Sequence, residues 1–228
     1  MKPGIYLTAK EILKLKTELP PIKKVLDEIY NPEIKVFTQD ALERAPKQFW
    51  TYPCSKRSKT EGIEKRKYHA PFNLVEPGGI INHSVVCAYC ALEGLKRYTE
   101  FRKPVADWRR WIITTKWSDL AISAALLHDI CKNGDNITAP WGEQMHPRHG
   151  ELAVEFLVHL PSLKAVPFED IHEILCGTMW HMGNFGPLPS SKKFSEFELV
   201  IQEADFYSTR VFLENVDIEL INYPPKDP

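Results

Sequence analysis

Residues 124–134 read AALLHDICKNG, and this stretch decides how the rest of the chain is interpreted. Four apolar residues precede His128 and Asp129, and Lys132 follows about one helical turn later. Ionised groups are rarely buried without partners, so these side chains need either solvent or a metal ion, and an unpaired buried aspartate would cost several kcal/mol. The pair therefore needs partners, and imidazole with carboxylate suits a borderline divalent metal ion.

The composition around this stretch is that of an ordinary globular protein. The 228 residues are 43% hydrophobic and 26% charged, which is enough for a sizeable core. With 29 basic and 30 acidic residues the formal charge is -1, so the whole chain does not indicate nucleic acid or an anionic membrane as partner. Five cysteines without framework spacing suit reduced thiols. No apolar run reaches a membrane span and no signal peptide is recognisable, so we expect a cytoplasmic protein without membrane contact.

Hydrophobic periodicity predicts an all-α fold. A capping box at Thr8 and Glu11 predicts a helix that ends at the prolines 20 and 21, where a second helix begins. A short helical turn is expected over residues 40–46. Residues 54–79 have neither helical nor strand period and are predicted to form a long loop, and such loops are often functional. The later helices are expected at about 82–98, 105–114, 118–132, 147–160, 168–182 and 195–214.

These elements suggest three parts of the chain. Residues 1–65 are predicted to form a small N-terminal helical extension and a basic loop. Residues 66–214 are predicted to form one larger helical bundle, and residues 215–228 a C-terminal tail.

Nearly all of the further potential ligands lie near the ends of other predicted helices, where the helices of a bundle can converge on one point. Because adjacent residues of a helix point about 100° apart, His128 and Asp129 can both reach one cluster if Asp129 bridges two ions. The other candidates are His83, His146, His149, His181 and Asp205.

In their order along the chain these motifs resemble those of the HD-domain superfamily of metal-dependent phosphohydrolases. GGIINHSVV (78–86) is similar to the GGLLEHT opening of that family, and AALLHDICK (124–132) to its ALLHDIGK signature. MHPRHG (145–150) supplies a histidine followed by glycine, TMWHMGNFGPLP (178–189) resembles the SHHG segment, and QEADFYSTR (202–210) resembles HADxLDA. The resemblance covers roughly residues 66–212 and implies an HD-domain helical bundle.

The resemblance implies that each of these five segments supplies ligands to a centre of two metal ions. It assigns one ion to His83, His128, Asp129 and Asp205, with Asp129 bridging to a second ion held by His146 and His181. His146 is preferred to His149, its substitute, because Gly150 follows it by four residues. Two positions depart from the family pattern without removing a ligand: Cys131 stands where glycine is common, and Met182 where a second histidine is common.

The implied activity is hydrolysis of a phosphate ester or anhydride, most often of a nucleotide, by a metal-activated water. Asp129 and Lys132 are the expected catalytic residues, and the two ions per chain are drawn from Mn, Fe, Co, Ni, Zn and Mg. Positively charged side chains near these ligand-bearing segments are candidates for binding phosphate. The predicted substrate-binding residues are Lys132, Arg148, His69, Arg66 and Lys67.

Two other activities of the same superfamily stay open, as does a regulatory module that has lost catalysis. One is a 3'-5' exonuclease or nucleic-acid phosphodiesterase, disfavoured because no separate strand-rich module precedes the bundle. The other is a diiron oxygenase, which uses the same ligand order and also keeps the lysine three residues after the His-Asp pair. Substrate identity and oligomeric state are not determined by these motifs.

Overall fold

The structure is a computed structural model that describes residues 5–6, 18–54, 78–101, 107–134, 145–183, 186, 191–208 and 221–222. It confirms the all-α class, and none of the helices in these ranges is both long and apolar enough to cross a membrane. The helices are α2 (Pro20–Asp27), α3 (Pro32–Arg44), α4 (Lys47–Thr51), α5 (Gly79–Phe101), α6 (Asp107–Leu127), α7 (His149–Val158), the 3-10 helix η4 (Pro161–Ala165), α8 (Phe168–Trp180) and α9 (Glu196–Ser208). Two strands of two residues each, β1 (Ile5–Tyr6) and β2 (Ile221–Asn222), pair in parallel.

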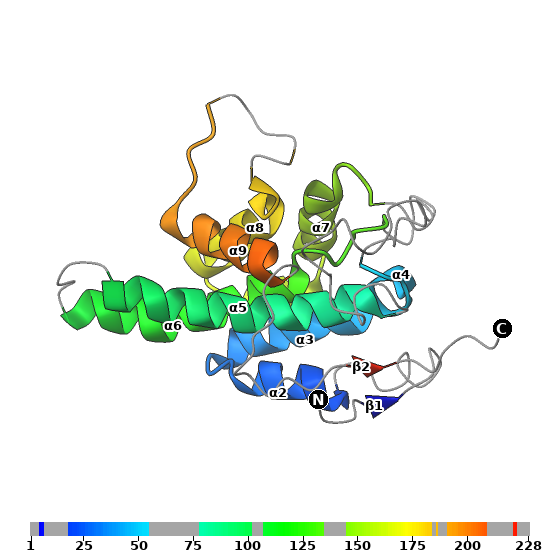
Figure 1. Ribbon diagram of the computed structural model, residues 1–228, viewed down its shortest axis with the longest axis horizontal. Helices are drawn as coiled ribbons and strands as arrows, with labels where there is room; N and C mark the ends of the chain where they lie inside the picture. Colours follow the sequence, from blue (N-terminus) through cyan, green and yellow to red (C-terminus); the bar gives the residue numbers. More distant parts are fainter. Residues whose placement is uncertain are drawn as a thin grey trace, which may run out of the picture.

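The long helices α5 and α6 lie side by side and form the central layer of the molecule (Figure 1). α2 and α3 pack on one side of this pair, and α4 packs against α5. On the other side α9 packs along α5, α8 packs on α6, and α7 packs on α8. The start of α5 and the end of α6 consequently meet the ends of α8 and α9, which places several helix ends together.

One hydrophobic core runs through all of these layers, from Leu19 in front of α2 to Ala204 in α9. The second half of α6 lies at its centre, where residues 120–127 are completely buried. A helix that is apolar on every side is expected to be enclosed by neighbours. This enclosure explains why the apolar run ahead of His128 has no polar face.

The start of α3 is tied to α6 by hydrogen bonds. The Asn31 side chain caps α3 by accepting from the amides of Glu33 and Ile34. The Asp119 carboxylate on α6 accepts from the amides of Tyr30 at 3.0 Å and Asn31 at 2.8 Å. The N-terminal helices therefore share the core of the later ones, while the predicted boundary at residues 65 and 66 lies outside the described ranges.

Some predicted helix limits were wrong. The two helices expected at 105–114 and 118–132 are the single helix α6, because residues 115–117 contain neither glycine nor proline to interrupt it. The turn expected at 40–46 is the end of α3, whose cap at Asn31 was overlooked. The helix expected before the prolines lies largely outside the described residues, but a helix does begin at Pro20.

Candidate metal centre

Four histidines from four different helix ends converge in the core. His83 lies near the start of α5, His128 follows the last residue of α6, His149 begins α7, and His181 ends α8. Each is at most 2% exposed. Asp129 is buried beside them, and Asp205 reaches the same point from α9.

His83 and His128 form what we call the first histidine pair. Their Nε2 atoms are 3.0 Å apart. Asp205 Oδ1 lies 3.0 Å from His83 Nε2 and 3.6 Å from His128 Nε2. Asp129 Oδ2 lies 3.4 Å from both nitrogens. Two nitrogens and two carboxylates thus surround one point.

His149 and His181 form the second histidine pair. Their Nε2 atoms are 2.9 Å apart. The other oxygen of Asp129, Oδ1, lies 3.2 Å from His149 Nε2 and 3.6 Å from His181 Nε2. The two oxygens of one carboxylate therefore face different histidine pairs.

The Nδ1 atom of every ring is held by a hydrogen bond that fixes the ring's orientation. Nδ1 donates to the carbonyl three residues earlier in His128 (2.7 Å), His149 (2.9 Å) and His181 (2.7 Å). His83 Nδ1 lies 3.0 Å from Ser208 Oγ, whose own proton goes to the Asp205 carbonyl. With Nδ1 as the donor, Nε2 of a neutral ring carries the lone pair that binds a metal.

The cluster requires positive charge between its members. If all four rings were neutral, the Nε2 lone pairs of each histidine pair would face one another at about 3 Å. Asp129 Oδ1 is buried and has no hydrogen-bond donor among the described residues. Such atoms need a proton or a metal ion, and borderline divalent ions favour imidazole and carboxylate ligands. The donor set therefore fits metal binding.

The pKa values follow from this crowding. Burial lowers the pKa of His83, and burial with the neighbouring His128 lowers the pKa of His181 to about 3. Burial alone would raise the pKa of Asp129, but Lys132 and His128 hold it well below its usual range. Burial would lower the pKa of His128, yet Asp129 holds it well above the ordinary value. A proton on His128 thus supplies charge that a metal ion could replace.

Lys132 lies at the edge of the cluster with a side chain that is 13% exposed. Its Nζ is 2.5 Å from Asp129 Oδ2, on the side of the first histidine pair. Burial alone would lower the pKa of Lys132, but Asp129 holds it above its usual range. The same Nζ lies 3.4 Å from Cys54 Sγ.

The structure places His149, not His146, in the cluster, contrary to the preference drawn from the sequence. A Cβ on Gly150 would lie 2.5 Å from the Met179 carbonyl oxygen, so the start of α7 packs directly on the α8 backbone. This close contact points His149, the residue before the glycine, toward His181. His146 is partly exposed, and its carbonyl accepts the hydrogen bond from His149 Nδ1. The spacing of four residues to the glycine was therefore the wrong guide.

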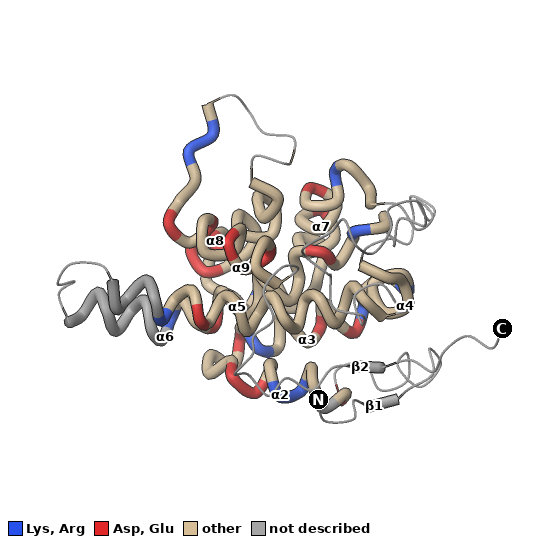
Figure 2. Tube along the Cα trace, viewed as in Figure 1, with Lys and Arg blue, Asp and Glu red and all other residues tan. Residues whose placement is uncertain are grey.

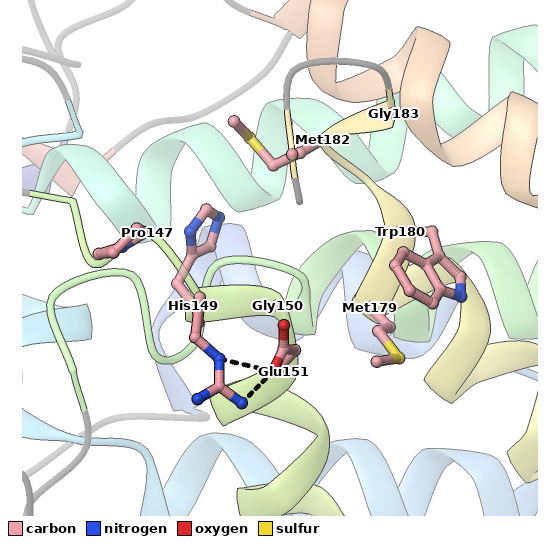
Figure 3. Close-up of a pocket in the computed structure, with 10 residues that line it drawn as sticks. Pro147, His149, Gly150, Glu151, Met179, Trp180, Met182 and Gly183 are labelled. Atoms are coloured by element: carbon pink, nitrogen blue, oxygen red, sulfur yellow. Dashed lines mark hydrogen bonds and ion pairs between the residues drawn. The ribbon is translucent and has the colours of Figure 1, made fainter. Parts of the chain in front are cut away.

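Arg148 does not reach the cluster. Its side chain is 62% exposed and forms an ion pair with Glu151 on the first turn of α7. Both residues line a pocket between the start of α7 and the end of α8, where Figure 3 labels Glu151, His149 and Trp180. The other predicted phosphate-binding residues, Arg66, Lys67 and His69, lie outside the described residues. In Figure 2 the described Lys and Arg positions are dispersed, whereas acidic positions gather on α8 and α9.

Two residues of the site were not anticipated from the sequence. Ser208 lies three residues after Asp205 and orients His83, a role that only the approach of α9 to α5 reveals. Cys54 was assigned to the long loop, where nothing in its surroundings distinguished it.

Compared with known proteins, the chain matches no family model, no curated protein and no solved structure.

Proposed function

We propose that this chain is a metal-dependent phosphohydrolase of the HD-domain type, which cleaves a phosphate ester or anhydride, with a nucleotide as the favoured substrate. One observation carries the proposal: two buried histidine pairs share a single carboxylate, with one oxygen of Asp129 directed to each pair. That arrangement suits two neighbouring divalent ions. The order of these residues along the chain is that of the HD motifs.

The residues that would hold each ion follow from the contacts. One ion would be held by the first histidine pair, Asp205 and Asp129 Oδ2, and the other by the second histidine pair and Asp129 Oδ1. Divalent ions bound there supply Lewis acidity toward phosphoryl oxygens and lower the pKa of coordinated water. The hydrogen bonds at Nδ1 keep the four rings oriented before an ion arrives, as is usual for metal-binding histidines.

The position of the Lys132 ammonium favours a phosphorylated substrate over a neutral one. Its ammonium lies beside the shared carboxylate, and its partial exposure lets a substrate approach from solvent. A cation positioned on a non-bridging phosphate oxygen stabilises the transition state by about 2 to 4 kcal/mol.

The packing of the N-terminal helices supports a small substrate over nucleic acid. Within the described residues, α2, α3 and α4 belong to the common hydrophobic core and do not form a separate strand-rich module of the kind that binds single strands. A mononucleotide needs only the neighbourhood of the cluster and Lys132. We therefore place nucleic-acid phosphodiesterase activity second.

The test is phosphate release from a panel of nucleotides. Protein stripped with a chelator is reloaded with Mn or Co and assayed without oxygen, and the bound metal is counted by elemental analysis. Wild type should bind two ions and release phosphate, and Asp129→Ala should do neither. His159→Ala, which removes an exposed histidine outside the cluster, serves as the control and should behave like wild type.

Two outcomes would overturn the proposal. Strict dependence on iron and oxygen, with no phosphoester cleaved under any metal, would replace it with the diiron oxygenase. Full activity of Asp129→Ala would remove the cluster from the reaction altogether.

A further inference from the structure

Cys54 reaches the candidate metal centre from residues 52–54, the described segment after α4, which contributes no other side chain to it. The segment after α4 runs beside the start of α5, where the Ile80 amide donates to the Tyr52 carbonyl at 3.3 Å. Three residues beyond Ile80 lies His83, and two beyond Tyr52 lies Cys54. This contact brings the thiol to the first histidine pair.

The distances are those of potential ligands to one ion. Cys54 Sγ, a ring nitrogen of His83 and a carboxylate oxygen of Asp129 all lie within 4.8 Å of one another. A sulfur and a nitrogen that bind the same zinc ion lie at most about 4.4 Å apart, which is the sum of the two bond lengths to the metal. Small side-chain adjustments therefore suffice for all three to bind the same ion.

Burial, together with the carboxylates of Asp129 and Asp205, raises the pKa of the Cys54 thiol to about 11, whereas the Lys132 ammonium acts in the opposite direction. The Lys132 ammonium lies 3.4 Å from Cys54 Sγ and 2.5 Å from Asp129 Oδ2, so a cation already lies beside both potential ligands. Independently of the cysteine, the buried Asp129 Oδ1, on the side of the second histidine pair, has no donor among the described residues, and the His83 Nε2 lone pair faces the cluster on the side of the first pair. The thiol thus adjoins a cluster that itself demands a cation.

We infer that Cys54 is a further ligand of the ion held by the first histidine pair, and that it directs this position toward thiophilic ions. The inference rests on the metal centre of the proposed function. When the sulfur–metal bond forms, the Cys54 S–H bond is lost and its proton passes to solvent, with no change of oxidation state. Thiolate ligands favour Zn, Co and Fe over Mg and Mn, which prefer oxygen.

Cobalt spectroscopy tests this directly, because thiolate bound to Co(II) gives an intense near-ultraviolet charge-transfer band that imidazole and carboxylate do not. Apoprotein is titrated with Co(II) without oxygen, and absorbance is compared with bound cobalt. Wild type and Cys176→Ser should give the band, since Cys176 lies on α8 beside His172, outside the cluster. Cys54→Ser should lose the band, keep the weaker visible bands of Co(II), and bind Zn at least about tenfold more weakly with little change for Mn.

The outcomes separate this inference from the proposed function. Cobalt bound by wild type without a charge-transfer band would refute Cys54 as a ligand and leave the histidine and carboxylate centre intact. No cobalt bound by wild type would refute both. Cys87 is a buried cysteine of α5 whose thiol adjoins His128. A band that survives in Cys54→Ser but disappears in Cys87→Ser would refute Cys54 and identify Cys87 as the sulfur ligand. If Cys54→Ser does not fold, X-ray absorption of Zn-loaded wild type decides, since a sulfur ligand lies at about 2.3 Å.

Discussion

Gly150→Ala is the sharpest test of how the second histidine pair is positioned. The added Cβ would lie 2.5 Å from the Met179 carbonyl oxygen, whereas ordinary contact begins at 3.4 Å. Because the obstructing atom belongs to the α8 backbone, it cannot rotate aside. The start of α7 must therefore move away from α8 by about 0.9 Å, the difference between these two distances.

The size of the effect follows from that displacement. Overpacking of this kind costs about 1 to 3 kcal/mol, and the higher helix propensity of alanine returns up to about 1 kcal/mol. A net loss of about 1 to 2 kcal/mol lowers the Tm of a protein of this size by about 2 to 8 °C. Metal ligands tolerate errors of about 0.2 Å, so moving His149 should weaken binding of the second ion about 10- to 100-fold.

Calorimetric unfolding and Mn titration with elemental analysis measure both effects. The control is Gly94→Ala within α5, whose Cβ would lie at an ordinary 3.7 Å from the Val200 side chain. That substitution should raise stability by up to about 1 kcal/mol and leave both ions in place. A Gly150→Ala protein with wild-type Tm and two tightly bound ions would refute the argument that this glycine sets the position of His149.

Four other predictions, one of them with a control substitution, give distinct results. Asp129→Ala should abolish binding of both ions while circular dichroism still reports a helical protein; two retained ions would refute its bridging role. His149→Ala should lose the second ion by elemental analysis, whereas His146→Ala should keep it; the reverse result would restore the assignment drawn from the sequence. Lys132→Ala should lower kcat/KM about 30- to 1000-fold at unchanged metal content, and an unchanged rate would show that its charge is not used. Asp119→Ala should cost about 1 to 3 kcal/mol in urea unfolding, because two backbone amides ahead of α3 lose their acceptor; unchanged stability would mean that water replaces it.

Much of the fold and most of the cluster could be predicted because the signals are local. The apolar run before His128 marks a buried helix, and the pairing of His128 with Asp129 at its end marks a polar group that needs partners. The positions of His83 and His181 follow the same logic, since each lies near one end of a predicted helix, whereas Asp205 lies in the middle of the helix predicted at 195–214. The structure brings all five together.

The rest depends on tertiary contacts that no local pattern reports. The choice between His146 and His149 is made by the contact of Gly150 with the α8 backbone, which involves residues about 30 positions apart in the chain. Cys54 reaches the cluster only because the segment after α4 pairs with the start of α5. Helix limits were missed where a single side chain decided them, as Asn31 does for α3.

The hydrogen bonds of His128 and His181 have a consequence for how the chain can change in length. Each ring donates to a carbonyl in the last turn of the helix that precedes it, one of the groups that helix termini leave without an amide partner. The histidine at the end of each helix is thus also the residue that would bind the ion. The direction of its ring therefore depends on the number of residues that separate it from the last turn of that helix. One residue inserted near the end of α6 would turn His128 by about 100°. Residues gained or lost where α5 ends and α6 begins, at the far end of both helices (Figure 1), would leave the cluster untouched, so length variation among relatives of this chain should gather there.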